Sequence, residues 1–523
     1  MEATTTTPPS SPRANWRLYL AAAWMSLGAI FWGYDIGIIS TIYVAPGFIS
    51  SLHHPSSSET GLITAIYYAG SWTGYAFIAG PVNEKCGRRW TGFWGVSILC
   101  VGAALQAGAV HLSMMIIGRI VAGLGTSLVA CAVPLYLSEI SPARTRGAFV
   151  ACNQIGIVAG ISVAFWIGYG FSHWTTGRGV DLQWRLSVIM QFVPAVLYLA
   201  LIPFFPESPR WLMEQDRVDD AAKALAALRG HSSNVASVQS ELDEIHANIL
   251  WHKTHSVKSA RVLFTDRPLF ARLWRAWTLN FLQQMSGASG IRYYLPSNFS
   301  AAGTSKELSL LASGIDGTVQ VACTIVGLLL IDRIGRRWAL SSSAAIMAFS
   351  LMINGALQTA YPNQVNSAAN YCNIFFIFFF TLGYSIGSGP VTWIYSSEIF
   401  PANVRASGLG IAASGQSIGA IIVGQVWPVA VQNIGARTYF IFMAFNLVCL
   451  ALVVLACPET AKKSLEEIDS HFGRMNVLDE RDLGVGDKEM EKERVGYAET
   501  VEVAEAVGGT EVRKDVRTQA STG

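Results

Sequence analysis

The feature that most constrains the fold is a series of long apolar segments separated by polar connections. Crossing the hydrocarbon core of a bilayer, about 30 Å thick, takes roughly 20 mostly apolar residues, and twelve segments of the sequence meet that requirement. Their approximate ranges are 17–43, 61–82, 90–109, 113–138, 148–172, 184–205, 270–296, 308–331, 338–360, 371–399, 408–432 and 438–456. Hydrophobic residues make up 51% of the 523 and charged residues only 14%, a balance typical of membrane proteins. We expect an all-α protein with twelve transmembrane helices in the lipid bilayer.

The basic residues predict how the chain is oriented. Lys85, Arg144, Arg333 and Arg405 all lie in connections on the same side of the predicted helices, and Arg17 begins the first segment. Positive residues concentrate on the cytoplasmic side of membrane proteins. We therefore expect a multi-pass membrane protein with both termini in the cytoplasm.

The twelve segments form two groups of six around a long polar connection. We predict an N-terminal six-helix bundle over 17–205 and a C-terminal one over 270–456. Residues 206–269 carry Ala, Leu and charged residues at helical spacing, which predicts a cytoplasmic linker with short helices. The polar, Pro-rich residues 1–16 and most of the charged tail, 457–523, are predicted to be disordered on the cytoplasmic side.

Three short sequences occur once in each half, in the same order. "EKCGRR" follows the second segment and "DRIGRR" the eighth; "YLSEISPARTRG" ends the fourth and "YSSEIFPANVRASG" the tenth; "PES" follows the sixth and "PET" the twelfth. Chance hardly explains three echoes in one order, so we infer a duplicated six-helix unit. Parallel repeats of this kind build transporters whose site lies at the membrane midplane between the halves.

With "GYD" in the first segment, "PESPRWL" after the sixth and "QQMSG" in the seventh, the chain resembles the sugar porter family of the major facilitator superfamily over about residues 16–470. The resemblance is to proton-coupled monosaccharide transporters. It implies two pseudo-symmetric bundles that rock about a central sugar site, open alternately to each side, and work as a monomer in the plasma membrane.

Asp35 and Arg119 are charged residues inside predicted membrane helices, where charge is costly and usually functional. The second half shows no charged equivalent of either residue. The resemblance implies that they couple proton entry to transport, because the matching Asp and Arg do so in proton-coupled sugar porters. A static ion pair that only holds two helices together is the alternative.

Amide and aromatic side chains predict the sugar site, since a neutral sugar needs groups that both donate and accept hydrogen bonds and an aromatic face for its ring. By resemblance, the residues that match family sugar contacts are Gln154, Gln283, Gln284 and Trp393, and those that match the extracellular gate are Tyr293 and Tyr294. Polar contacts between helices are the alternative role for each glutamine.

Several positions depart from the family pattern. Ser289 replaces a sugar-binding Asn of the family, and Gln320 and Gln416 stand where an Asn is expected. The pocket must therefore differ in shape from that of a typical glucose carrier. Arg292 stands where the family carries an apolar residue, and it could pair with the carboxylate of a sugar acid or with a neighbour such as Asp316.

Charged residues at the predicted cytoplasmic helix ends recur in both halves. The set comprises Glu84, Arg88, Glu139, Arg146, Asp332, Arg336, Glu398 and Arg405. Topology signals explain the arginines but not glutamates at fixed spacing. We expect these residues to form a latch between the halves that is broken in each cycle.

The sequence thus predicts a transporter and gives little support to an enzyme, since no nucleophile elbow, zinc-protease motif or P-loop is present. The eight cysteines form no CxxC pair, and we expect no metal site, no cofactor and no nucleic-acid partner. The predicted function is sugar:proton symport of a hexose or pentose, driven by the proton gradient. Transport of a sugar acid of the galacturonate or quinate type is the alternative, and a transporter-like sugar sensor is the alternative from another class.

Overall fold

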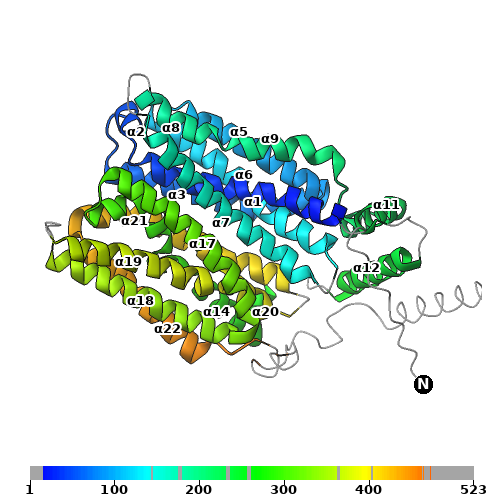
Figure 1. Cartoon of the computed structure of the whole chain (residues 1–523). Helices are drawn as coiled ribbons and strands as arrows, with labels where there is room; N and C mark the ends of the chain where they lie inside the picture. The colour runs from blue at the N-terminus through cyan, green and yellow to red at the C-terminus, as the bar shows by residue number, and fades with distance from the viewer. Residues whose placement is uncertain are drawn as a thin grey trace, which may run out of the picture.

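Long helices lying side by side make up almost all of the described chain (Figure 1). The structure is a computed structural model that describes residues 16–142, 145–174, 179–230, 236–255, 261–361, 366–401, 404–461, 463 and 472. The segments expected to be disordered lie almost entirely outside the described residues, and so do the side chains of Arg146 and Asp332.

The first half contains six membrane-spanning helical units. They are α1(Trp16–Ile42), α3(Ser57–Phe77) continued by α4(Ala79–Cys86), α5(Arg88–Ala107), α6(Leu112–Ile140), α7(Arg146–Ser172), and α8(Gly179–Ile189) continued by α9(Phe192–Leu201) and the short η2(Ile202–Phe204). A short helix, α2(Pro46–Ser51), connects the first two units. Ser56 and Glu59 form a capping box that fixes the start of α3.

The second half repeats the six units. They are α14(Arg267–Gln283) continued by η3(Gln284–Ala288), α15(Ser289–Tyr293) and α16(Leu295–Ala301); α17(Lys306–Ile334); α18(Arg336–Ala360); α19(Ser367–Gly383) continued by η4(Tyr384–Ser388) and α20(Gly389–Glu398); α21(Arg405–Ile434); and α22(Arg437–Ala456). Within the described ranges, ten of the twelve units contain a helix long and apolar enough to cross a membrane. The second and seventh units are not among these ten.

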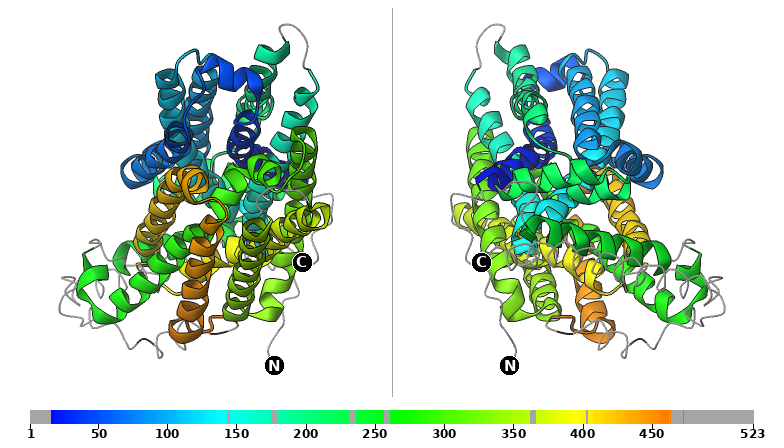
Figure 2. Two further views of the ribbon diagram at one scale, coloured as in Figure 1. Left: turned by 90° about the vertical axis from the view of Figure 1, so that its left-hand side faces the viewer. Right: turned by 90° about the vertical axis from the view of Figure 1, so that its right-hand side faces the viewer.

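The two halves pack against each other along two helix pairs, α3 with α21 and α7 with α17. The end-on views show each half as its own group of helices (Figure 2). One apolar core includes Trp24 of the first half together with Tyr294 and Trp427 of the second, whereas a separate core around Leu273 and Tyr395 belongs to the second half alone. The halves therefore share a core over only part of their length.

The connection between the halves forms four linker helices, α10(Pro209–Glu214), α11(Val218–Arg229), α12(Ala236–His255) and α13(Val262–Thr265). Of these, α11 and α12 are the helices expected there, and they lie beyond one end of the bundles (Figure 1). Leu225 and Leu242 contribute to their own small core, and Arg229 donates to the carbonyl of Ile140 at 2.9 Å. We call this the linker end and the opposite end, where α2 lies, the α2 end.

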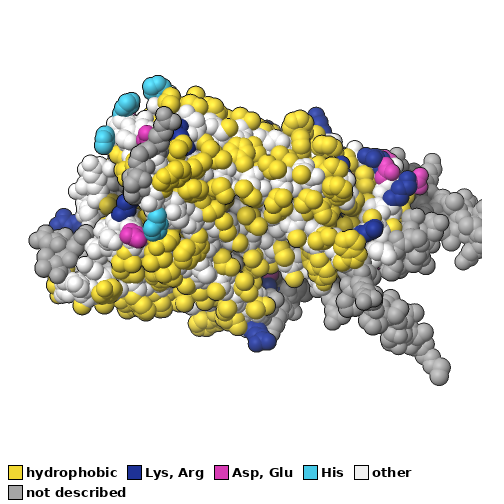
Figure 3. All heavy atoms as spheres, turned by 45° about the horizontal axis from the view of Figure 1, so that its top comes forward, with side chains coloured by type: hydrophobic (Ala, Val, Ile, Leu, Met, Phe, Trp, Pro, Cys, Tyr) yellow, Lys and Arg dark blue, Asp and Glu magenta, His cyan; other side chains and the backbone are white. Residues whose placement is uncertain are grey.

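The face in Figure 3 carries a broad apolar surface, with charged and histidine side chains gathered toward its two ends. Exposed apolar side chains include Val101, Ile117, Val196, Leu329 and Phe375. An apolar surface of this extent needs an apolar surrounding, and long helices satisfy their own backbone hydrogen bonds inside a bilayer. The chain is therefore a multi-pass membrane protein.

Candidate functional site

Asp35 and Arg119 form an ion pair inside the first half. Arg119 Nη1 of α6 lies 2.9 Å from Asp35 Oδ2 of α1, and both side chains are fully buried. The predicted contact is therefore present. When one partner of a buried ion pair becomes neutral, the charge of the other is left uncompensated, which destabilises this arrangement of the helices.

Two residues that the sequence did not single out complete this pair. Gln106 Nε2 of α5 donates to Asp35 Oδ1 at 3.4 Å, and the Tyr67 ring of α3 lies under the Arg119 guanidinium at 4.2 Å. Tyr67 in turn shares a hydrogen bond with Thr126. The pair thus connects four helices of one half, and its protonation state can affect how they pack.

The seventh and tenth units each contain a π-helical turn, η3 and η4. Such turns are frequent at functional sites because they widen the helix and free backbone groups. Gly287 in η3 has φ +89°, which favours glycine. Gln283 Nε2 connects the two turns by donating to the carbonyls of Ser388 at 2.8 Å and Gly389 at 3.2 Å.

A small cavity lies between these two units, α17 and the first half. It is lined by Phe165 of α7, Ala288, Ile291, Arg292, Leu295, Asp316, Gln320, Phe380, Thr381 and Tyr384. Its volume of about 20 Å³ is room for about one water molecule, so the cavity is too small for a sugar in this conformation. The three polar residues that the sequence analysis singled out here, Arg292, Asp316 and Gln320, are brought together.

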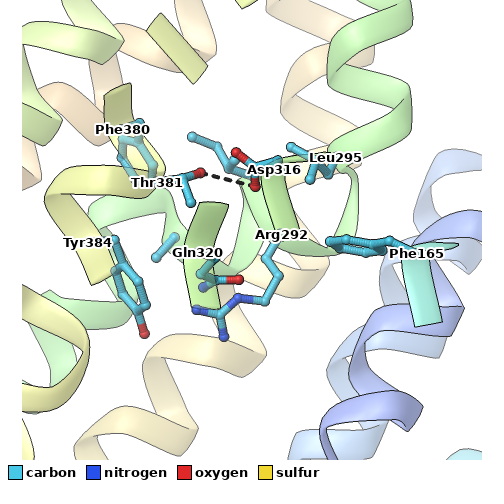
Figure 4. Close-up of a pocket in the computed structure, with 10 residues that line it drawn as sticks. Phe165, Arg292, Leu295, Asp316, Gln320, Phe380, Thr381 and Tyr384 are labelled. Carbon is cyan, nitrogen blue, oxygen red and sulfur yellow. Dashed lines mark hydrogen bonds between the residues drawn. The ribbon is translucent and has the colours of Figure 1, made fainter. Parts of the chain in front are cut away.

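Arg292 and Asp316 do not form the ion pair considered from the sequence. Arg292 Cζ lies 4.9 Å from the centre of the Tyr384 ring, and its guanidinium points past Gln320, away from Asp316 (Figure 4). The Asp316 carboxyl is instead turned toward Thr381, whose hydroxyl donates to Oδ2 at 3.2 Å. The charges of the two side chains therefore do not neutralise each other through direct contact.

The remaining residues predicted to bind sugar differ in how deeply they are buried. Gln284 accepts a hydrogen bond from Ser289, and both are buried. Gln154 on α7 and Gln416 on α21 are partly buried, and Trp393 on α20 is 36% exposed. The structure thus groups Gln320 with Arg292 in the cavity, while Gln283 and Gln284 bond to other protein groups.

The two tyrosines predicted as the gate bridge the halves toward the α2 end. Tyr293 donates to the Tyr68 hydroxyl at 2.7 Å, and the Tyr294 hydroxyl lies 2.9 Å from that of Thr64. Tyr294 also donates to the carbonyl of Gly424 at 3.0 Å and stacks on Tyr43. The predicted gate residues therefore contact the opposite half in this conformation, which is the arrangement expected of a closed gate.

Other polar contacts between the halves are also found toward the α2 end. Gln425 donates to the carbonyl of Ser58 at 3.1 Å, and His173 lies 3.2 Å from Glu307. The charged latch residues behave differently. Arg88 pairs with Glu139 at 2.8 Å and Arg336 with Glu398 at 2.9 Å, each within one half.

The structure therefore corrects the picture of a latch in this conformation. Glu84 is exposed and Arg405 donates to the carbonyl of Phe400 in its own half, so neither bridges the halves here. The physical reason is that Glu139 and Glu398 also accept hydrogen bonds from the segment after the last helix of their own half. Ser208 donates to Glu139 and Thr460 to Glu398. A latch across the halves stays a prediction for a conformation closed at the linker end.

Glu207 and Glu459, in the repeated "PES" and "PET", were not predicted as site residues. Glu207 accepts from the backbone N–H groups of Arg88 and Arg89, and Glu459 from those of Arg336 and Arg337, at 2.9–3.1 Å. Each thus caps the first turn of a helix far away in sequence. Burial raises the pKa of Glu207 despite these bonds, whereas the pKa of the more exposed Glu459 is lowered because its four backbone N–H donors outweigh desolvation.

Comparison with known proteins decides the family. Residues 21–472 match the family described as "Sugar (and other) transporter". The chain belongs to the sugar transporter family. Proteins of this family are transporters and not enzymes, and this is true of the chain described here.

Curated relatives cover most of this sugar transporter family member. It is 32% identical to the MFS-type transporter criB of Aspergillus cristatus, over 85% of this chain and 91% of the relative. It is 31% identical to a probable quinate permease of Neosartorya fischeri, over 88% of each chain. It is also 31% identical to the arabinose-proton symporter of Bacillus subtilis, over 85% of this chain and 92% of the relative.

Among solved structures, the inward open conformation of the xylose transporter XylE from E. coli is similar, with a TM-score of 0.72 and 23% identity over 87% of this chain and 100% of that one. At this identity the likeness concerns the fold alone. It confirms the expected all-α major facilitator fold of twelve helices in two halves for this sugar transporter family member.

Proposed function

We propose that the protein is a secondary active transporter that carries a monosaccharide together with a proton by alternating access. The observation that carries the proposal is the fully buried Asp35–Arg119 pair in the first half. A buried carboxylate in a membrane helix is costly and is usually functional. A proton can neutralise it reversibly. The arabinose-proton symporter among the relatives supports the same coupling.

Protonation of Asp35 can affect the gate through the packing of α1. Asp35 lies on α1, which packs along α7 and also contacts α15, the helix that bears Arg292 and Tyr293. A proton on Asp35 removes its attraction to Arg119 and frees α1 to shift against α15. The gate at the α2 end can then open or close with the occupancy of the central site.

We assign the linker end to the cytoplasm because the basic residues of the connections gather there, and we place both termini on that side. The plasma membrane is the proposed location, and the monomer is the proposed functional unit. The proton gradient supplies the energy, so no cofactor is required.

A sugar acid is the second candidate substrate, and Arg292 is the observation that favours it. In the described part of the chain Arg292 forms no ion pair with a carboxylate, and it lines the cavity beside Gln320. An Arg in this position can bind a carboxylate in a bidentate manner. Quinate permeases among the relatives support this candidate.

Uptake into liposomes that contain the purified protein tests the proposal. An inward proton gradient should drive accumulation of labelled D-xylose or D-glucose, and unlabelled pentoses, hexoses, galacturonate and quinate should compete according to their fit. Accumulation of labelled D-galacturonate without accumulation of either labelled sugar would replace the first candidate with the second. Absence of flux with every compound would contradict transport and favour the sensor.

A further inference from the structure

Asp316 is a buried acidic residue that the coupling through Asp35 does not use. It lies on α17 in the second half and is 3% exposed. Thr381 donates to its Oδ2, while Oδ1 has no hydrogen-bond partner among the residues that the structure describes. A carboxylate in this environment is expensive to keep ionised without a cationic partner.

The potential cationic partner is in the same cavity but not in contact. Arg292 and Asp316 both line the cavity, and their charged groups point in different directions (Figure 4). No direct ion pair joins the Arg292 guanidinium to the Asp316 carboxyl. A small side-chain movement, or a substrate that fills the cavity, can therefore change whether Asp316 or another anion neutralises Arg292.

Few other titratable groups face Asp316. Tyr384 of the tenth unit and Arg292 of α15 line the same cavity, and α7 contributes the apolar Phe165. Cys323 lies two turns further along α17 itself. The charge of the cavity is therefore set by Arg292 and Asp316, and it is positive when Asp316 is protonated and neutral when Asp316 is ionised.

We propose that Asp316 is a second proton-binding carboxyl and that its proton decides whether Arg292 is available to an anionic substrate. With the proton bound, Arg292 is the only charge in the cavity and can receive a carboxylate. When the proton leaves to the water on the other side of the membrane, the Asp316 carboxylate competes for Arg292 and the substrate anion is released. Linkage requires that proton and acid each strengthen the binding of the other.

This inference deepens the proposed transport and rests on the substrate entering the Arg292 cavity. One proton on Asp35 and one on Asp316 move with each acidic substrate, whereas a neutral sugar, which has no carboxylate for Arg292, moves with the Asp35 proton alone. A sugar acid with one negative charge crosses with two protons and a net charge of one.

The charge moved per substrate tests the proposal. It is obtained from the membrane potential at which net flux stops, in liposomes that contain the full-length protein, with D-xylose or D-galacturonate as the labelled probe. Asp316→Asn should lower the charge per substrate by one for D-galacturonate and leave it unchanged for D-xylose. Asp219→Asn, an exposed substitution on α11, should leave it unchanged. An unchanged charge per D-galacturonate in Asp316→Asn would overturn the proposal.

A second measurement does not depend on transport. Infrared difference spectra of the protein in liposomes, recorded across a change of pH, should contain the stretch of a protonated carboxyl that disappears in Asp316→Asn. Thr381→Val should keep this band and move its frequency, because one hydrogen bond to the carboxyl is lost. If neither probe is transported, the proposed function fails while the spectra still decide on Asp316. A wild-type spectrum reproduced by Asp316→Asn would overturn the second proton site.

Discussion

At the scale of single residues, two buried acids with different surroundings lie in the two halves. Asp35 contacts Arg119 directly at 2.9 Å, whereas Asp316 shares a cavity with an Arg that it does not contact. The sequence indicated the importance of Asp35, Arg119 and Arg292, because charge in a membrane helix is conspicuous. It could not indicate Gln106 or Tyr67, because polar and aromatic residues are common in such helices and only packing shows which ones reach the pair.

Asp35→Asn should abolish accumulation against a gradient. The amide cannot carry a proton, yet it retains the shape of the carboxyl and can still accept a hydrogen bond from Arg119. We expect the steady-state concentration ratio driven by a pH gradient to fall to about one, while exchange of labelled for unlabelled sugar continues. Asp243→Asn, an exposed change on α12, is the control. Continued uphill accumulation in Asp35→Asn would refute coupling through this residue.

At the scale of helices, breaks in the seventh and tenth units create the cavity. The sequence predicted single apolar segments at 270–296 and 371–399, since hydropathy averages over a π turn and does not detect it. Glycines gave a hint, because Gly287 and Gly290 lie at and just after η3. A Cβ on Gly290 would lie 2.0 Å from the Trp427 ring of α21. The closed arrangement of α15 therefore depends on a missing side chain.

Gly290→Ala should disfavour the conformation closed at the α2 end. Forcing a methyl group against Trp427 costs about 1–3 kcal/mol, which corresponds to at least about a fivefold shift in the equilibrium toward the open form. Accessibility of a cysteine placed at Thr64, beneath the gate, to a water-soluble reagent measures the shift. Gly410→Ala, where an added Cβ meets nothing within 4 Å, is the matched control and should leave accessibility unchanged.

Glu207 and Glu459, which follow the last helix of each half, should respond differently to loss of charge. Glu459→Gln weakens hydrogen bonds to a helix N-terminus and should lower stability at pH 7 by about 1 kcal/mol. Glu207→Gln should cost less, because it also removes a buried charge, and the pKa of Glu207 is raised by that burial. Thermal unfolding of the two variants in detergent measures the difference.

The pH dependence of Glu459→Gln follows from the direction of the pKa shift. The pKa of Glu459 is lower in the folded protein, so its carboxylate stabilises the fold above the unfolded pKa of about 4.3. This contribution disappears as the pH falls through the lowered folded value. The deficit of Glu459→Gln should therefore be constant from pH 8 to about pH 5 and shrink below about pH 4. A deficit that grows on acidification would contradict the assignment.

At the scale of the whole molecule, the halves are joined by polar contacts toward the α2 end, while the repeated charges near the linker end pair within each half. The sequence predicted the twelve helices, the duplication and the linker helices, because each has a local periodic signal. It did not predict which conformation is populated or where the repeated charges pair. Those properties depend on small free-energy differences between packings of the same helices.

Tyr294→Phe should shift the molecule toward the form open at the α2 end. It removes the hydroxyl that contacts Thr64 across the halves and Gly424 within its own half, and each hydrogen bond is worth about 1 kcal/mol. Hydrogen–deuterium exchange should increase at the start of α3 and in α16 and decrease at the linker end. Tyr371→Phe, on a side chain that is 69% exposed, should change neither.

The contacts of Glu207 and Glu459 bear on how the protein is made. Each joins the residues that follow the sixth helix of a half to the start of its third helix, so every half is tied together by its own last residues. On the ribosome, the first half has all of its internal partners once Ser208 has been added, before any of the second half exists. The two halves can therefore mature in succession as separate units, and only their docking must wait for the end of translation.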